Sequence, residues 1–111
     1  MLPQASADDR HRALALATQR GHVEITRALL DAGADPNRYH PKGMHAHGTP
    51  LHHAALGGHE AVVRLLVERG ARLDLEDTIY HATPAGWADH GGHPAIATFL
   101  RDAAAASRRT E

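Results

Sequence analysis

The sequence predicts an all-α solenoid of three stacked helix-turn-helix units, and three recurring features of the chain support that prediction. Gly-His pairs begin at positions 21, 58 and 92, so a similar segment returns about every 34 residues. A Thr-Pro pair stands ahead of the second and third segments, at 49–50 and 83–84. Each segment also carries apolar residues at the spacing of an amphipathic helix. Repeats of this length are typical of stacked helix pairs, which bury an apolar face only against their neighbours.

The first helix of each unit is predicted from its start signals. Thr49 and Thr83 are good N-caps, because a threonine hydroxyl accepts a hydrogen bond from an otherwise unpaired backbone N–H of the first turn. The proline that follows each threonine has no N–H to leave unpaired, and its fixed φ suits the first helical position. The first unit lacks Thr-Pro, but Ser6-Ala7-Asp8-Asp9 predicts a capping box ahead of a longer first helix.

The second helix of each unit is predicted from a broad apolar stripe. Gly33 and Gly70 end the first two of these helices, because glycine readily adopts the left-handed conformation of a helix C-terminus. The segments 34–48 and 71–82 contain turn residues and short extended runs, so we expect them to project as β-hairpin-like loops. They are called the first finger and the second finger below. The apolar stripes comprise Ile25, Ala28, Leu29 and Leu30, then Val62, Val63, Leu65 and Leu66, then Ile96, Ala97, Phe99 and Leu100.

Residues 49–59 resemble the ankyrin repeat, because they read Thr-Pro-Leu-His-His-Ala-Ala-Leu-Gly-Gly-His and the signature of that family is T-P-L-H-x-A. In the third unit Ala85-Gly86-Trp87 replaces Leu51-His52-His53, a variant similar to that of small bacterial ankyrin repeat proteins. The resemblance implies a protein that binds another protein through its finger tips and the concave face of its first helices. It also implies one domain, 1–111, with repeats at about 8–37, 48–74 and 78–104 and a tail at 105–111.

The composition of the two ends favours a complete small array. Ser6-Ala7-Asp8-Asp9 caps the first helix, and the alanines 103–106 extend the last one before residues that we expect to fray. A segment of a longer array is the alternative. The oligomeric state stays open between a monomer and a weak homo-oligomer. The outer side of the third repeat, with Ile96 and Phe99, is covered either by the alanine tail or by another copy of the chain.

Composition and charge argue against several classes of function. The 111-residue chain has no cysteine, so it has no disulfide framework and no thiol nucleophile. Its net charge of −1 gives no global attraction to nucleic acid or to a membrane surface. The N-terminus lacks the features of a signal peptide and no apolar run is long enough to span a bilayer, so the predicted compartment is the cytoplasm. The predominance of arginine over lysine indicates a GC-rich bacterial genome.

The chain contains no catalytic motif. It lacks a Gly-rich phosphate loop, a nucleophile elbow and the paired histidines of a zinc-protease helix. Glu76 and Asp77 are adjacent carboxylates, but we expect them at a solvated loop tip, where acids are rarely perturbed. The sequence therefore predicts a protein that is not an enzyme and that holds no cofactor.

The first finger is the main candidate for contact with a partner protein. It is several residues longer than the loop of a typical repeat, and it collects Arg38, Tyr39, His40 and Met44. Exposed Tyr, Met and Arg side chains are enriched in the cores of protein interfaces, so we predict that these four residues contact the partner. The alternative is that Tyr39 and Met44 fold back and pack the longer loop onto its own repeat.

Further contact residues are predicted on the second finger and on the helices. The second finger supplies Tyr80 and His81, which are next to each other in the sequence. The family resemblance adds Leu56 and His90 on first helices and Arg69 near the end of a second helix. The single tryptophan, at position 87, is predicted to pack within the last repeat, and a binding anchor on the concave face is the alternative.

The eleven histidines also suggest a metal site. His45 and His47 lie on the same face of the chain if the segment is extended, and zinc accepts imidazole nitrogens. A neighbouring histidine would have to supply a third ligand. The family resemblance explains other histidines, because the imidazole of His52 in T-P-L-H ties adjacent loops together. A zinc-responsive binding module is therefore the second hypothesis, behind histidines that brace loops.

Overall fold

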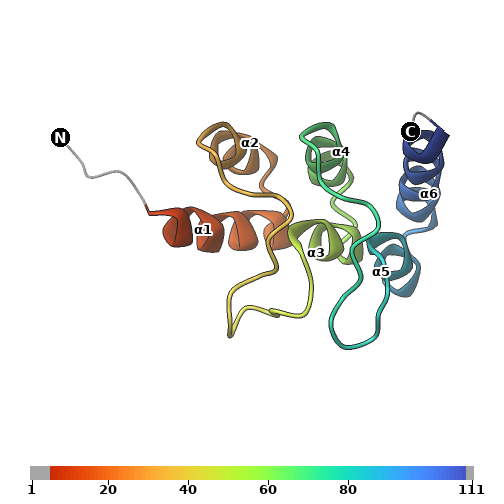
Figure 1. The fold of residues 1–111 in the computed structure, drawn as a ribbon, viewed down its shortest axis with the longest axis horizontal. Helices are drawn as coiled ribbons and strands as arrows, with labels where there is room; N and C mark the ends of the chain where they lie inside the picture. Colours follow the sequence, from red (N-terminus) through yellow and green to blue (C-terminus); the bar gives the residue numbers. More distant parts are fainter. Residues whose placement is uncertain (1–5, 110–111) are drawn as a thin grey trace.

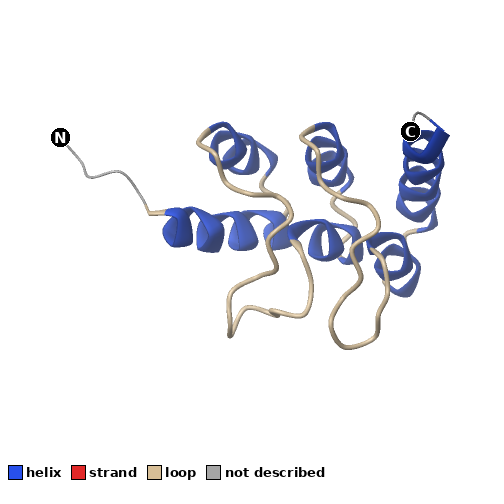
Figure 2. Ribbon diagram, viewed as in Figure 1, coloured by secondary structure: helices blue, strands red, loops and turns tan. Residues whose placement is uncertain are grey.

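Residues 6–109 are described in the computed structural model, and residues 1–5 and 110–111, which end the predicted tail, lie outside the described residues. The described chain forms six helices and no strand, which confirms the predicted all-α solenoid. The first helices α1, α3 and α5 form one layer, and the second helices α2, α4 and α6 form the other (Figures 1 and 2). The bounds are α1 Ala7–Arg20, α2 Val23–Asp31, α3 Pro50–Leu56, α4 Glu60–Glu68, α5 Pro84–His90 and α6 Pro94–Arg109.

Both fingers project from the layer of first helices (Figure 1). Neither finger contains a strand within residues 6–109, but backbone hydrogen bonds hold them in hairpin-like loops. The His40 N–H donates to the Gly48 carbonyl at 3.0 Å and closes the first finger. The Thr78 N–H donates to the His47 carbonyl at 2.9 Å and joins the second finger to the first.

The predicted helix starts are confirmed by their hydrogen bonds. The Thr49 hydroxyl accepts from the His52 N–H at 3.5 Å, and the His52 Nδ1 accepts from the Thr49 N–H at 3.1 Å, which completes a capping box. The opposite ring nitrogen of His52, Nε2, donates to the Ala82 carbonyl at 2.9 Å. His52 therefore ties the start of the second repeat to the start of the third. Ser6 and Thr83 also cap their helices with the side-chain hydroxyl.

The Gly-His pairs recur because the glycine of one repeat accommodates the histidine of the next. A Cβ atom at Gly21 would lie 2.5 Å from the His59 Nδ1, and one at Gly58 would lie 2.5 Å from the His93 Cε1. No side chain fits at either glycine without displacing a ring. The His59 Nε2–H also donates to the Gln19 carbonyl at 2.9 Å, so the contact between repeats is polar as well as close.

The second and third apolar stripes, with Leu29 and Leu30 of the first, meet in one core that extends from α1 to α6. Ile25 and Ala28 of the first stripe are exposed instead of buried. Leu14, Leu51, Val63 and Leu66 are each at most 1% exposed. Burying one such side chain stabilises the fold by about 1.5–3 kcal/mol relative to leaving it in water. In residues 6–109, no helix combines the length and the apolar character that crossing a membrane requires.

The outer face of the first repeat is less well covered than the core. Ser6 caps α1 as predicted, but Leu16 is 41% exposed and Ile25 is 53% exposed on this repeat. At the other end of the solenoid, the alanines 103–106 continue α6 as predicted. The N-terminus of the first helix is therefore capped, while the side of the first repeat that has no neighbour still presents apolar side chains.

Candidate functional site

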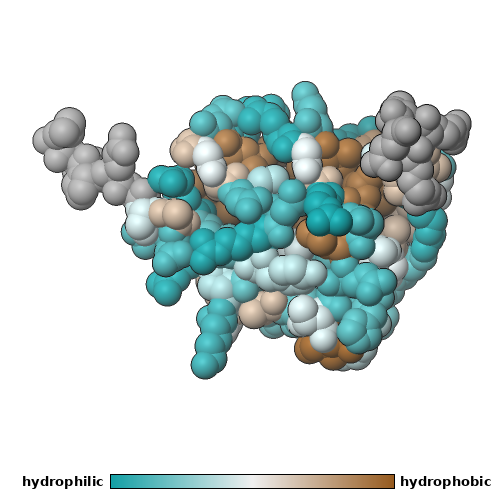
Figure 3. All heavy atoms as spheres, viewed as in Figure 1, coloured by the Kyte–Doolittle hydropathy of each residue, from teal (hydrophilic) through white to brown (hydrophobic). Residues whose placement is uncertain are grey.

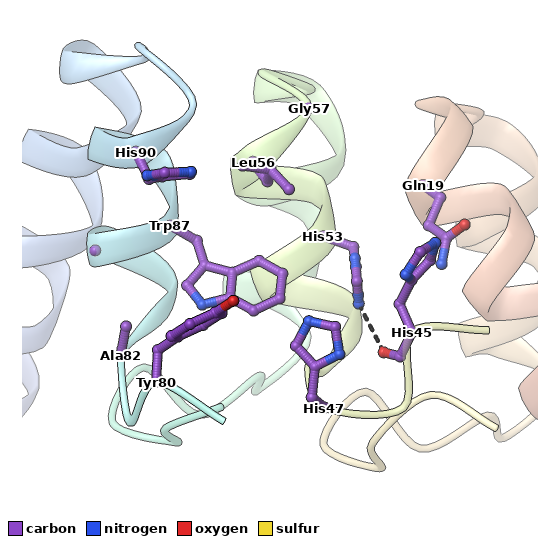
Figure 4. A pocket seen from close by; sticks show the side chains of 11 residues that line it. Gln19, His45, His47, His53, Leu56, Gly57, Tyr80, Ala82, Trp87 and His90 are labelled. Atoms are coloured by element: carbon purple, nitrogen blue, oxygen red, sulfur yellow. Dashed lines mark hydrogen bonds between the residues drawn. The ribbon is translucent and has the colours of Figure 1, made fainter. Parts of the chain in front are cut away.

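A groove of about 750 Å³ lies between the first helices and the two fingers (Figure 4). Its lining comes from α1, α3 and α5 and from both fingers, so it crosses all three repeats. Four of the lining residues are histidines, and the described lining contains no Asp, Glu, Lys or Arg. The lining residues are Gln19, His45, His47, His53, Leu56, Gly57, Tyr80, Ala82, Gly86, Trp87 and His90.

Trp87 occupies the middle of this lining (Figure 4). It is 8% exposed, and its ring centroid lies 4.9 Å from that of His52, 5.1 Å from that of His53 and 5.3 Å from that of His47. Its Nε1–H donates to the Asp77 carboxylate at 2.8 Å. The tryptophan is therefore packed and hydrogen-bonded, as predicted, and it also presents an edge to the groove.

Asp77 anchors the second finger from inside. Its side chain is only 1% exposed, and its carboxylate accepts hydrogen bonds from the backbone N–H groups of Ile79 at 2.9 Å, Tyr80 at 2.5 Å and Ala82 at 2.9 Å. The Asp77 N–H also donates to the Ala82 carbonyl at 2.9 Å. The prediction of a solvated carboxylate at this position is therefore wrong, because the finger wraps around the side chain.

Hydrogen bonds keep the Asp77 carboxylate ionised. Burial by itself would raise its pKa, but the hydrogen bonds from Trp87 and from the backbone of Tyr80, Ala82 and Ile79 together lower the pKa well below its ordinary value. A carboxylate with such a pKa neither donates nor takes up a proton near neutral pH. Asp77 is thus a structural acceptor rather than a candidate acid or base.

Histidine rings pack beneath the first finger. His40 and His53 are stacked, with centroids 4.2 Å apart and an interplanar angle of 18°. His11 lies edge-on to His40 at 6.4 Å, and His45 lies 5.8 Å from His53. His11 and His40 are both 3% exposed. The finger is therefore attached to α1 and α3 through imidazole rings.

These buried rings are neutral at physiological pH. Burial, aided by the neighbouring His53, lowers the pKa of His40 to about 3. Burial also lowers the pKa of His53 to about 4, although a hydrogen bond to the His45 carbonyl opposes the shift. The pKa of His11 is lowered by burial as well. A charged imidazole would have to be desolvated here, so each ring stays uncharged.

Backbone carbonyls hold the neutral rings in place. The His11 Nε2–H donates to the Tyr39 carbonyl at 2.5 Å, and the His53 Nε2–H donates to the His45 carbonyl at 3.1 Å (Figure 4). Because a carbonyl only accepts, these bonds assign the proton to Nε2 in both rings. The histidines of this region thus brace the first finger, in line with the loop-bracing hypothesis.

The zinc hypothesis finds no support in the described chain. The rings of His45 and His47 lie 6.2 Å apart. His45 has φ 59°, so the segment is not extended as the prediction required. Within residues 6–109 no group of three His, Cys, Asp or Glu side chains is arranged to hold a metal ion.

Three of the nine predicted contact residues line the groove: Leu56 from α3, Tyr80 from the second finger and His90 from α5. Leu56 is 37% exposed and Tyr80 is 76% exposed. Figure 4 shows their side chains on elements from two repeats, directed at the same hollow. The structure therefore brings together residues that lie up to 34 positions apart in the sequence.

The four predicted residues of the first finger lie outside the groove lining. Arg38 is exposed and ion-paired, and Met44 is half-buried. Tyr39 is half-buried, and its hydroxyl donates to the Glu76 carbonyl of the second finger at 2.6 Å. His40 is buried within the histidine cluster, so we leave it out of the contact surface. The hydrogen bond of Tyr39 and the burial of His40 both favour the alternative in which the first finger folds back onto the protein.

The two remaining candidates lie apart from the groove. Arg69 follows α4 and pairs with Asp31 at 2.6 Å, which places it near the ends of the second helices. His81 is exposed beside Tyr80 in the second finger and has φ 56°, in the left-handed region. Neither side chain is part of the described groove lining.

The groove also contains residues that sequence reasoning did not assign to contact. His53 and Trp87 occupy equivalent positions in the second and third repeats, where the first repeat has Leu16. Both line the groove, and so do Gln19 and His47. The change from Leu to His to Trp at one repeat position was an available signal, because a position that only filled the core would keep an apolar residue throughout.

The molecular surface is mostly hydrophilic on the face shown in Figure 3. Hydrophobic colour appears between the second helices and at the lower edge, where Figure 1 places the tip of the second finger. The exposed apolar residues of that finger are Ile79, at 57%, and Tyr80, at 76%. The second finger therefore presents apolar side chains to solvent next to the groove.

These features define a helix-pair repeat protein with an open groove along its first helices and fingers. Two family models match the chain: one described as "Ankyrin repeats (many copies)" covers residues 11–67, and one described as "Ankyrin repeats (3 copies)" covers residues 40–109. The chain belongs to the ankyrin repeat family.

Curated relatives of very different size share this similarity. "Cyclin-dependent kinase 4 inhibitor B" of Homo sapiens is 32% identical, over 92% of this chain and 93% of that protein. "Cyclin-dependent kinase inhibitor 2A" of Homo sapiens is 33% identical, over 86% of this chain and 79% of that protein. "Palmitoyltransferase Hip14" of Drosophila melanogaster is 33% identical over 83% of this chain, but the match spans only 14% of that protein.

Proposed function

We propose that this chain is a non-catalytic module that binds another protein in the groove between its first helices and fingers. The observation that carries the proposal is the groove lining, which crosses three repeats and combines exposed Leu56 and Tyr80 with an edge of Trp87. Aromatic side chains supply much of the binding energy in protein interfaces when they are desolvated by a partner.

The chemistry of the lining fits a partner with apolar side chains and hydrogen-bonding groups. Tyr80, His47 and His90 each have polar side-chain atoms that make no hydrogen bond to another described residue. The lining includes no Asp, Glu, Lys or Arg. A partner would therefore find hydrogen-bond donors and acceptors without having to desolvate a strong charge.

The hydrogen-bonded fingers favour binding without a large entropic cost. Asp77 fixes the shape of the second finger, and Tyr39 ties that finger to the first. Groups that are already ordered in the free protein lose little conformational freedom when a partner arrives, so more of the contact energy appears as affinity.

The relatives support binding rather than catalysis. Two relatives that match over most of their length are named as inhibitors of cyclin-dependent kinases, and an inhibitor acts by binding its target. The palmitoyltransferase matches only in a small part of its length, so its enzymatic activity belongs to a protein that is mostly outside the match. We do not transfer either target to this chain, because ankyrin surfaces differ in their exposed residues.

We further propose that residues 1–111 act as one domain of three repeats in the cytoplasm of a bacterium. It would work without a cofactor, nucleic acid or a membrane, as a monomer or a weak homo-oligomer. The uniform solenoid and the near-neutral charge support this description. Arg38, Tyr39, Met44, Arg69 and His81 would then be peripheral contacts at most, around a centre formed by Leu56, Tyr80 and His90.

The test compares proteins captured from a lysate of the source cell by wild type and by three variants. Leu56→Arg and Tyr80→Ala change the groove, whereas Ile79→Ala changes an exposed apolar residue of the same finger that does not line it. We expect wild type and Ile79→Ala to retain one partner protein that both groove variants lose by about tenfold or more. Equal recovery by all four proteins would overturn the assignment of the groove.

A further inference from the structure

The first repeat exposes a position that the other repeats bury. Ile25, Val62 and Ile96 each stand three residues after the histidine of a Gly-His pair. Val62 is 1% exposed and Ile96 is 6% exposed, whereas Ile25 is 53% exposed. The second and third repeats have a preceding repeat and the first has none within the described chain. The preceding repeat is therefore what covers this position.

The third repeat ends in an open slot of the matching kind. Gly21, Gly58 and Gly92 share a left-handed backbone, with φ 74°, 74° and 80°. His59 and His93 pack on the first two glycines, but no described atom of a neighbouring residue lies within 4 Å of a Cβ built at Gly92. The slot at Gly92 has the same backbone shape as the filled slots and lacks only the histidine of a following repeat.

The first repeat carries the unused histidine that would fill such a slot. His22 precedes α2 with φ −83°, close to the φ −85° of His59 before α4. The residue is exposed, and its imidazole ring makes no hydrogen bond to another described residue. His22 lies just before α2, in the first repeat, and Gly92 lies between α5 and α6, in the third. The open histidine and the open glycine slot therefore belong to the two end repeats of the solenoid, whose helices are labelled in Figure 1.

We propose that two copies of this chain associate head to tail, with His22 and Ile25 of one copy packed on the Gly92 end of the next. The contact continues the interface between consecutive repeats. His59 donates to the Gln19 carbonyl at 2.9 Å within the chain, and the position equivalent to Gln19 in the third repeat is His90. His22 of the second copy would therefore donate to the His90 carbonyl of the first.

Both surfaces favour this contact on physical grounds. Covering Ile25 as Val62 is covered removes exposed apolar area from water, which stabilises association. At the other end, the open slot at Gly92 has room for a ring, as the filled slots at Gly21 and Gly58 do. The contact joins different surfaces of the two copies, so it leaves one free end of each kind and permits further copies to add. The proposal can be tested apart from the proposed function, because it uses only the backbone carbonyl of His90 and no side chain at the centre of the groove.

The experiment measures the mass of the intact chain by sedimentation equilibrium over a wide concentration range. Wild type should grow beyond a dimer as concentration rises. Ile25→Arg blocks the first end with a charge, and Gly92→Asn fills the slot while keeping a residue type that tolerates positive φ. Each variant alone should remain a monomer. An equimolar mixture should form a one-to-one dimer that grows no further, because each variant retains one intact end.

A matched control separates docking from folding. Gly70→Asn introduces the same side chain at another glycine with positive φ, 87°, and open space around it, but in the middle repeat. This variant should assemble as wild type does, and circular dichroism should show all the variants folded. A wild type that stays monomeric at every concentration would overturn the proposal. So would a Gly92→Asn variant that assembles as well as wild type, since the contact would then not use the slot.

Discussion

The two fingers occupy equivalent places in successive repeats, yet opposite chemistry holds them. The first finger rests on the neutral rings of His40 and His53, stacked at 4.2 Å. The second finger wraps an ionised carboxylate, Asp77, that accepts from the indole of Trp87 and from three backbone N–H groups. A buried carboxylate keeps its charge when enough donors point at it, whereas a buried imidazole stays neutral when desolvation outweighs the acceptors around it.

The difference shows that the equivalent loops of successive repeats can contain two different kinds of buried polar group. Neither finger places an unpaired charge inside the protein. The imidazole rings of the first finger are neutral, and the carboxylate of the second finger is hydrogen-bonded. The His40 Nε2 has no hydrogen-bond partner in the described chain, and the Met44 carbonyl 3.3 Å from its Nδ1 does not offset the effect of burial on the pKa of the ring. The two fingers should therefore fail under different perturbations.

Removing the carboxylate of the second finger should have the largest effect. Asp77→Ala leaves the Trp87 Nε1–H and three backbone donors without their acceptor, and even one hydrogen bond to a charged group is worth about 1.5–3 kcal/mol. We expect the free energy of unfolding to fall by about 3 kcal/mol or more. Urea denaturation followed by circular dichroism measures the change.

Trp87→Phe is the matched control for that substitution. It removes the indole donor and keeps the three backbone bonds, so the loss should be smaller than for Asp77→Ala. If the two variants lose the same free energy, the backbone donors contribute nothing, and the carboxylate does not organise the second finger.

Mild acid should weaken the first finger before the second. The pKa of His40 is about 3 and that of His53 about 4 in the folded protein, below the ordinary 6.5. The unfolded chain therefore binds protons below pH 6.5 that the folded chain does not, so stability is highest above pH 6.5 and falls as the pH drops towards 4. Each such histidine adds up to about 1.4 kcal/mol per pH unit to the slope.

The second finger should respond only at lower pH. The folded pKa of Asp77 is below the ordinary 3.8, so its contribution is present above pH 3.8 and is lost as the pH falls further. His40→Phe should reduce the slope between pH 6.5 and 4 by the contribution of one histidine, up to about 1.4 kcal/mol per pH unit, whereas Asp77→Ala should leave that slope intact. Unfolding free energies at several pH values test this order, and an unchanged slope in His40→Phe would contradict it.

Breaking the bond between the fingers should have a moderate effect. Tyr39→Phe removes the hydroxyl that donates to the Glu76 carbonyl at 2.6 Å and leaves the ring in place. We expect a loss of about 0.5–1.5 kcal/mol in the free energy of unfolding. Hydrogen exchange should also accelerate at amides of the second finger. If exchange there is unchanged, the two fingers are independent of each other.

Breaking the ion pair between Arg38 of the first finger and Asp8 of α1 should have the smallest effect. Arg38 contacts Asp8 at 2.8 Å, but both side chains are exposed, and the pair is screened by solvent and salt. Arg38→Gln should leave the thermal midpoint of wild type within error. A clear drop would show that the first finger depends on charge and not only on its buried rings, which would break the contrast between the fingers.

Much of the fold could be predicted because its signals are local. Thr49 and Thr83 mark helix starts through bonds to residues three positions away, and the apolar stripes follow the helical period. The repetition of Gly-His pairs then gives the stacking, and Gly21 with His59 shows why that pair recurs. These features needed no knowledge of which distant residues meet.

Less of the candidate site could be predicted, because it depends on distant contacts. Leu56 and His90 were predicted from the family resemblance and Tyr80 from its place on the second finger, and all three line one groove. The residue type was misleading at two positions. Asp77 is an acid in a loop, yet the residue is buried. His40 is polar, yet it packs beneath its own finger. The rings around His40 belong to His11 and His53, which are distant in the sequence. Asp77, in contrast, accepts from backbone N–H groups two to five positions away, a local turn pattern that the sequence analysis overlooked.

The sequence by itself determined the class of fold, the number of helix pairs, the helix starts and the absence of cysteine chemistry, because these follow from composition and from spacings within one repeat. Only the tertiary structure decided which histidines are neutral, which carboxylate is ionised in the interior, and which side chains share a groove. The physical reason is that burial and hydrogen bonding there link residues far apart in the chain. His11 meets the Tyr39 carbonyl across 28 positions, and His59 meets that of Gln19 across 40.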